Sequence, residues 1–225
     1  YRKGNQMNPY YDRDGITIYH GDCLEILPQF PDKSFDLCLT DPPYGLNYHY
    51  LSYEDSVENL KHLIQHFVPE ARRVASLMVS FTGLSNLFLY PFPDWCCAWY
   101  WKGTNVYGKM GVNQWQPIIC YGKDLKGFGS INGVIKSDSF YYEGGNCGEV
   151  KDFSVHSCPK NLGIMQILVR RFSIENQIVL DPFMGSGTTL VAAKKLGRKA
   201  VGIELSEKYC EIAVKRIEAI PPNLP

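Results

Sequence analysis

The 225-residue sequence lacks several features that would place it in other functional classes. It contains no CxxC pair, no GxGxxG loop and no GK[ST] phosphate loop, so structural zinc, a nicotinamide dinucleotide and ATP are not favoured. No apolar run is long enough to span a membrane and no secretory leader is visible, so we expect no membrane partner. The formal net charge is zero, from 23 basic and 23 acidic residues, which argues against a broad, non-specific nucleic-acid-binding surface.

The eight cysteines are irregularly spaced, and some, such as Cys38 and Cys120, lie inside apolar runs. Thiols in such runs behave as small hydrophobic groups. We therefore expect a reduced, cytoplasmic protein without a metal site.

Short apolar segments alternate with segments of helical periodicity. We expect strands at residues 15–22, 35–40, 76–82, 96–101, 114–121, 177–181 and 198–205, and helices at 23–30, 56–73, 161–172, 188–196 and 206–220. Residues 122–150 are rich in Gly, Ser and Asn and are expected to be irregular. This alternation predicts an α/β fold with a mostly parallel sheet, and the length favours a single domain.

The segment Thr40-Asp41-Pro42-Pro43-Tyr44-Gly45 directly follows the expected strand 35–40. Two consecutive prolines exclude helix and strand and give a stiff turn at the carboxyl end of the strand, where open α/β sheets bind their ligands. The turn offers one carboxylate, the carbonyl of Pro42 and one aromatic face. This set suits an exocyclic amine on a flat ring, with two acceptors for its N–H groups and a platform for the ring. An ordinary surface turn is the alternative.

A second group of residues has the parts of a nucleotide-type cofactor site. The strand 177–181 ends in Asp181, a glycine-rich loop follows, and a helix begins at Thr188. Gly185 and Gly187 allow a ligand to approach the backbone closely. Glu204 ends the next strand, where a carboxylate can accept hydrogen bonds from both ribose hydroxyls.

Together these motifs resemble the β-class S-adenosylmethionine-dependent amino-methyltransferases of DNA, the N6-adenine and N4-cytosine family. The resemblance runs from about residue 8 to residue 217. It includes Gly21-Asp22-Cys23-Leu24, Asp41-Pro42-Pro43-Tyr44, Asp181-Pro182-Phe183-Met184-Gly185-Ser186-Gly187-Thr188-Thr189 and Gly202-Ile203-Glu204. It implies a single Rossmann-like domain with a mostly parallel seven-stranded sheet, helices on both faces and a circularly permuted motif order. The catalytic half would span about 8–121, a short target-recognition segment about 122–150, and the cofactor-binding half about 151–220.

The resemblance also implies the roles of individual residues. The catalytic residues would be Asp41, Pro42, Pro43 and Tyr44. The residues that bind S-adenosylmethionine would be Asp22, Cys23, Asp41, Lys160, Asp181, Pro182, Phe183, Gly185, Ser186, Gly187, Thr188, Glu204 and Leu205. Within this set, Phe183, Gly185 and Gly187 would surround the methionine part, Glu204 would hold the ribose, and Asp22 and Cys23 would border the adenine.

Family members with Asp before Pro-Pro-Tyr mostly methylate N6 of adenine. The resemblance therefore implies direct, in-line methyl transfer to a flipped-out adenine of DNA, with the Tyr44 ring stacked on the base. If only the ring face acts, the Tyr44 hydroxyl should matter little. Cytosine N4 of DNA, adenine of RNA, and a catalytically silent DNA-binding subunit of a methyltransferase pair are the alternatives. A homodimer, a companion recognition subunit or an accompanying restriction enzyme would each fit the family.

Residues 99–136 carry five lysines against one acid, with aromatic residues between them. This pattern is typical of contacts with phosphates and unstacked bases. For Trp99, Trp101 and Trp115, packing in the core is the alternative, since they alternate as strand residues do. The tyrosine-rich segment 45–53 is interpreted as a mobile lid or an ordinary surface loop.

Overall fold

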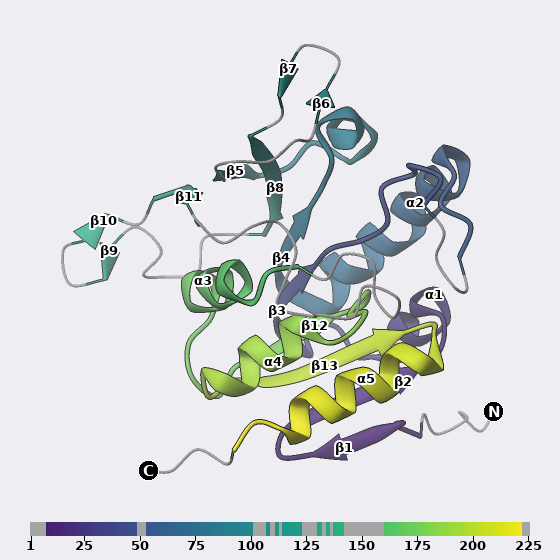
Figure 1. Cartoon of the computed structure of the whole chain (residues 1–225), viewed down its shortest axis with the longest axis vertical. Coiled ribbons are helices and arrows are strands. Elements are labelled where there is room, and N and C mark those ends of the chain that lie inside the picture. Colours follow the sequence, from purple (N-terminus) through teal and green to yellow (C-terminus); the bar gives the residue numbers. More distant parts are fainter. Residues whose placement is uncertain are drawn as a thin grey trace.

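A computed structural model describes residues 8–48, 53–100, 107–108, 111–112, 114–122, 130–131, 134–135, 137–141 and 160–221. The described residues form a sheet of nine strands in the order β1-β2-β13-β12-β3-β4-β8-β5-β11 (Figure 1). These strands are β1 (Tyr11–Arg13), β2 (Ile16–His20), β3 (Phe35–Thr40), β4 (Ala75–Phe81), β5 (Trp95–Tyr100), β8 (Trp115–Tyr121), β11 (Ser139–Tyr141), β12 (Ile178–Asp181) and β13 (Lys199–Glu204). Two further pairs lie outside this sheet: β6 (Tyr107–Gly108) with β7 (Gly111–Val112), and β9 (Ser130–Ile131) with β10 (Val134–Ile135).

The sheet is mostly parallel, as predicted. Strands β2, β13, β12, β3 and β4 run parallel to one another, and β11 runs parallel to β5. Strand β8 lies antiparallel between β4 and β5, and β1 is antiparallel to β2. The predicted count of seven strands is wrong for the described residues, because two three-residue edge strands, β1 and β11, extend the sheet.

Helices cover both faces of the sheet. Helix α1 (Cys23–Ile26), the 3₁₀ turn Leu27–Gln29 and α2 (Val57–Val74) lie on one face, and α3 (Leu162–Phe172), α4 (Thr188–Lys195) and α5 (Glu207–Glu218) lie on the other. Side chains alternate between the two cores along each strand. In β3, for example, Leu37 and Leu39 pack toward α3–α5, whereas Cys38 packs toward α2. The predicted doubly covered α/β architecture is therefore confirmed.

Two parts of the chain differ from their sequence-based predictions. Strand β1 was not among the predicted strands. It pairs with β2 across Asp14-Gly15, whose φ angles of 51° and 74° form a two-residue hairpin turn. The segment 122–150 was expected to be irregular, but its described residues include β9, β10 and β11. Strand β11 forms because Phe140 is buried against the core beside β5. The circular permutation and the division into catalytic, recognition and cofactor segments stay predictions.

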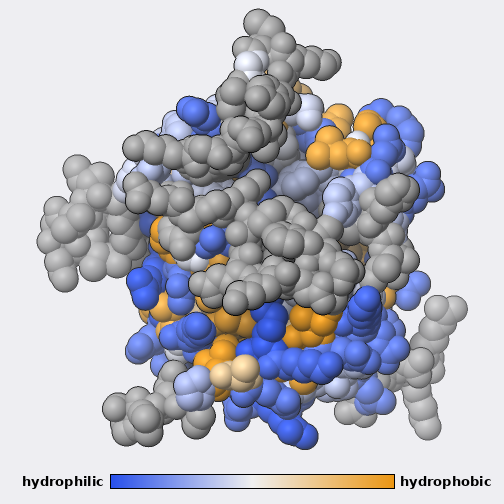
Figure 2. All heavy atoms as spheres, in the orientation of Figure 1, coloured by the Kyte–Doolittle hydropathy of each residue, from blue (hydrophilic) through white to orange (hydrophobic). Residues whose placement is uncertain are grey.

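The surface in Figure 2 carries its hydrophobic side chains in separate groups among hydrophilic ones. Within the described part of the chain, every helix is too short or too polar to cross a membrane. The same part holds no group of three or more His, Cys, Asp or Glu side chains arranged around a common metal position.

Candidate active site

The two sequence motifs meet at one edge of the sheet. Strands β3 and β12 are neighbours and run parallel, with Leu37 opposite Val179 and Cys38 opposite Leu180. The proline turn that follows β3 and the glycine-rich loop that follows β12 therefore lie side by side. A cavity of about 630 Å³ opens between them, within the usual size range of small-molecule sites. All predicted catalytic and cofactor-binding residues line it except Pro42 and Gly187.

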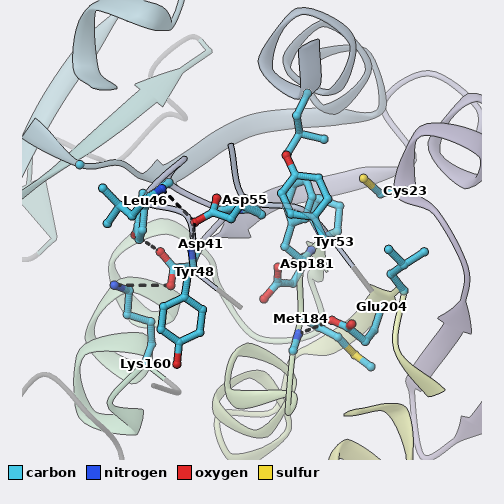
Figure 3. A pocket seen from close by; sticks show the side chains of 18 of the residues that line it. Cys23, Asp41, Leu46, Tyr48, Tyr53, Asp55, Lys160, Asp181, Met184 and Glu204 are labelled. Atoms are coloured by element: carbon cyan, nitrogen blue, oxygen red, sulfur yellow. Dashed lines mark hydrogen bonds and ion pairs between the residues drawn. The ribbon is translucent and has the colours of Figure 1, made fainter. Parts of the chain in front are cut away.

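Asp181 is the buried centre of this cavity (Figure 3). Its Oδ1 accepts hydrogen bonds from the Thr40 hydroxyl at 2.7 Å and the Phe183 backbone N–H at 3.1 Å, and its Oδ2 accepts one from the Thr189 hydroxyl. Burial raises the pKa of Asp181 to about 6, and these hydrogen bonds oppose the shift. Asp181 therefore connects the end of β3 with the glycine-rich loop and with the start of α4.

Glu204 stands at the end of β13 on the far side of the cavity. Its two carboxylate oxygens accept the backbone N–H groups of Gly185 at 3.0 Å and Ser206 at 2.8 Å. Burial raises the pKa of Glu204, and these N–H donors partly counter that effect. A carboxylate can accept about four hydrogen bonds, so Glu204 retains acceptor capacity for a ligand in the cavity that it lines.

Asp22 and Cys23 border the cavity close to Glu204. The Asp22 carboxylate caps α1 by accepting the backbone N–H of Leu24 at 2.8 Å. Cys23 is buried, and burial raises the pKa of its thiol. Leu205 is 40% exposed and follows Glu204 along the same wall.

The glycine-rich loop is fixed partly by its packing against α5. Gly187 has φ of 80°, and a Cβ there would lie 2.8 Å from Cβ of Ala213. Glycine is therefore required at position 187 by its backbone conformation and by the close approach of α5. The Arg216 guanidinium, also from α5, donates to the Ser186 carbonyl at 2.6 Å, to the Ser186 hydroxyl at 2.9 Å and to the Thr188 hydroxyl at 3.1 Å.

The opposite wall contains Asp41 and a linked set of polar side chains. Lys160 Nζ lies 3.4 Å from Asp41 Oδ2, and the Tyr44 hydroxyl donates to Asp41 Oδ1. Gln116 connects these two partners: its Nε2 donates to the Tyr44 hydroxyl at 2.7 Å, and its Oε1 accepts from Lys160 at 3.1 Å. Lys160 was predicted among the cofactor contacts, whereas here its charged partner is Asp41, across the cavity from Glu204 (Figure 3).

Tyr44 lines the cavity, and its hydroxyl is hydrogen-bonded to both Asp41 and Gln116. Burial raises the pKa of this hydroxyl well above its ordinary value, and the neighbouring Asp41 adds to the shift. Lys160 Nζ lies 5.6 Å from the centre of the Tyr44 ring and 4.9 Å from that of Phe81. Both the ring and the hydroxyl of Tyr44 thus make specific contacts, and whether the hydroxyl matters for activity stays a prediction.

Asp55 holds the segment that follows the proline turn. Its buried carboxylate accepts backbone N–H groups from Gly45 at 2.6 Å, Leu46 at 3.0 Å and Tyr48 at 3.2 Å. Residues 45–48 are thus organised around one side chain, while the rest of the proposed lid, 49–52, lies outside the described residues.

Sequence reasoning missed Asp55, Gln116 and Arg216. A usable signal existed for Gln116, a single polar side chain at the start of the apolar strand β8. The core alternative is correct for Trp99, which is fully buried, while Trp115 lines the cavity. Trp101 and the side chains of the basic segment, including Lys102, Lys109, Lys123 and Lys126, lie outside the described residues.

Comparison with known proteins gives consistent results. The profile of the family described as DNA methylase (N6_N4_Mtase) matches residues 97–215, more than half of the chain. The chain is 26% identical to the type II methyltransferase M.ScaI of Streptomyces caespitosus, over 96% of this chain and 86% of that protein. It is also 26% identical to the DNA adenine methyltransferase YhdJ of Escherichia coli (strain K12), over 92% of this chain and 84% of that protein.

Solved structures share the fold. The M1.HpyAVI–SAM complex superposes with a TM-score of 0.67 at 24% identity, covering 90% of this chain and 98% of that one. The cytosine-N4-specific PvuII DNA methyltransferase superposes with a TM-score of 0.70 at 16% identity, covering 96% and 90%. With the paired proline turn and glycine loop already in place, the profile match shows that the chain belongs to the DNA methylase family, the amino-methyltransferases of adenine N6 and cytosine N4.

Proposed function

We propose that this DNA methyltransferase transfers a methyl group from S-adenosylmethionine to N6 of adenine in DNA. The observation that carries the proposal is the position of Asp41. This residue directly precedes Pro-Pro-Tyr, and it lines the same cavity as the glycine-rich loop. Asp at this position is the residue that the family resemblance links to adenine. The similarity to a DNA adenine methyltransferase adds support.

The cavity fits S-adenosylmethionine in size and in charge. Its volume of about 630 Å³ is that of a small-molecule site. Carboxylates of Asp41, Asp181 and Glu204 line it, which favours a cationic ligand. When bound, the cofactor supplies an electrophilic methyl group on a positively charged sulfur. Glu204 would hold the ribose, Gly185 and Phe183 the methionine part, and Asp22 with Cys23 the adenine.

Asp41 and Pro42 would activate the target amine. The N6 lone pair of adenine is delocalised into the ring, so the amine is a poor nucleophile. The Asp41 carboxylate would accept one N6–H, and the family resemblance gives the other to the Pro42 carbonyl, although Pro42 is buried and is not among the residues that line the cavity. With its N–H groups held in this way, the nitrogen would move toward tetrahedral geometry and regain its lone pair. The lone pair would then be aimed at the methyl group that the bound cofactor supplies, and the Asp41 carboxylate, which holds one N6–H, would accept the surplus proton of the methylated amine. Positioning and fixed charges supply the rate, and no covalent enzyme intermediate is needed.

The Tyr44 ring would receive the base after it leaves the duplex. Tyr44 is among the residues that line the cavity, as Asp41 is, and aromatic stacking on a base contributes about 1–3 kcal/mol. The homodimer and the companion recognition subunit stay predictions, as does the role of residues 122–150 in choosing the target site.

Analysis of the methylated base tests the proposal. Unmethylated genomic DNA is incubated with the protein and methyl-labelled S-adenosylmethionine, digested to nucleosides and separated. We expect label in N6-methyldeoxyadenosine; label in N4-methyldeoxycytidine would assign the cytosine activity of the PvuII enzyme instead. Absence of label from a folded protein that binds the cofactor would favour the catalytically silent subunit. Asp41→Ala is the control, which should bind the cofactor and form product far more slowly.

A further inference from the structure

Gln116 occupies an unusual place for a glutamine. It lies near the start of β8 and is 8% exposed, in a strand whose other residues are almost all apolar. Because β8 runs antiparallel to β4, its first residues lie at the edge where β4 ends and the cavity opens. The amide therefore reaches the catalytic wall from a strand 72 residues away from Tyr44 in sequence.

The hydrogen bonds around Gln116 can run in only one direction. An ammonium group only donates, so Lys160 requires the amide oxygen of Gln116. The amide NH₂ group then faces Tyr44, whose oxygen must accept. The single proton of the Tyr44 hydroxyl is left to point at Asp41 Oδ1, which as a carboxylate can only accept.

This ordering leaves the two Asp41 oxygens in different states. Oδ1 accepts a hydrogen bond from the Tyr44 hydroxyl. Oδ2 lies 3.4 Å from Lys160 Nζ, beyond the usual range of an N–H···O hydrogen bond. Oδ2 is therefore compensated in charge but retains acceptor capacity. An incoming amino N–H would find its acceptor there.

We propose that Gln116 is a positioning residue for methyl transfer, which directs the Tyr44 hydroxyl proton onto Asp41 Oδ1 and reserves Oδ2 for the target amine. The inference rests on the proposed function, in which Asp41 accepts an amino N–H. It gives the Tyr44 hydroxyl a role that stacking alone would not require. In this proposal Gln116 acts through its hydrogen bond to the Tyr44 hydroxyl.

A double-mutant cycle tests this inference. Single-turnover methyl transfer into DNA is measured with total label, whichever base carries it, for wild type, Tyr44→Phe, Gln116→Met and the double variant. We expect each single variant to lose roughly tenfold in rate, the scale of one lost hydrogen bond to a charged group. Because Gln116 acts through the hydroxyl, the double variant should be no slower than Tyr44→Phe. If Gln116→Met lowers the transfer rate of the Tyr44→Phe variant by the same factor as it lowers the wild-type rate, the inference is overturned.

Further readouts separate positioning from a general structural role. Cofactor affinity and fluorescence of 2-aminopurine at the target position should stay close to wild type in Gln116→Met, because the Tyr44 ring face is kept. Gln116→Glu is the second variant should Gln116→Met fail to fold; it accepts from Tyr44, turns the proton away from Asp41 and should also slow transfer. A fully active Gln116→Glu would refute the inference.

Gln29→Met, at an exposed position, is the matched surface control. Because total label is counted, methylation of cytosine instead of adenine would overturn the proposed function and still leave the cycle interpretable.

Discussion

Replacing Asp181 by Asn should change how stability depends on pH. The Asp181 carboxyl has a pKa of about 6 in the folded protein, against an ordinary value of 3.8, because it is buried. Between these pH values the folded protein binds more protons at this site than the unfolded chain does. Its contribution to the free energy of unfolding therefore falls as pH rises from about 4 to about 6, and is constant above that.

The magnitude follows from the two pKa values. A tenfold change in a proton-binding constant corresponds to about 1.4 kcal/mol, so the interval from 3.8 to about 6 corresponds to about 3 kcal/mol. Asn lacks the titration but preserves the contacts: its Oδ1 can accept from Thr40 and Phe183, and its NH₂ group can donate to Thr189 once that hydroxyl turns. The stability of Asp181→Asn relative to wild type should thus rise by up to about 3 kcal/mol between pH 4 and pH 6.

Urea denaturation followed by tryptophan fluorescence measures the effect. Midpoints and slopes are collected for both proteins from pH 4 to pH 8 without cofactor, and the difference in unfolding free energy is plotted against pH. The raised pKa of Glu204 is common to both proteins and cancels. Asp138→Asn, at an exposed position, controls for the loss of one carboxylate. Parallel stability curves for wild type and Asp181→Asn would show that the Asp181 carboxyl is not held in its neutral form by burial.

Three further substitutions test the two walls of the cavity. Asp41→Ala should keep cofactor affinity and lose roughly two to three orders of magnitude in single-turnover rate; a near-normal rate would remove Asp41 from the mechanism. Glu204→Ala should weaken cofactor binding in calorimetry more than it slows transfer at saturating cofactor, and the reverse pattern would contradict the assignment. Arg216→Met removes the Nη1 group that makes three hydrogen bonds to the glycine-rich loop and the start of α4, and it should lower both the melting temperature and cofactor affinity, with Arg216→Lys intermediate; unchanged affinity would show that the loop holds its shape without Arg216.

The sequence predicted those parts of the site that depend on local backbone chemistry. Two consecutive prolines end a strand because neither has an N–H to donate to the sheet, and the predicted strand 35–40 coincides with β3. The strand–glycine loop–helix pattern likewise placed Asp181 and Gly185 correctly on the cavity wall. In both cases the relevant interactions lie within a few residues of one another, so they can be inferred from spacing alone.

The contacts that complete the site depend on pairing between distant segments. Gln116 reaches Tyr44 across 72 positions and Lys160 across 44, so its role follows from where β8 lies in the sheet. The reason for Gly187 was also tertiary, since the close neighbour is Ala213 of α5. By contrast, the hairpin at Asp14-Gly15 is a local feature, and an Asp-Gly pair is a turn signal that the sequence analysis did not use.

The three carboxylates of the cavity follow from the order of the sheet. Strands β13, β12 and β3 are neighbours and run parallel, so their carboxyl ends reach the same edge. Glu204 ends β13, Asp181 ends β12, and Asp41 is the first residue after β3. Gathering these charges has a cost, seen in the pKa of Asp181, which burial raises first and the charge of Asp41 raises further. We expect a sulfonium cation bound in the cavity to offset that cost, because its positive charge would stabilise the neighbouring carboxylates.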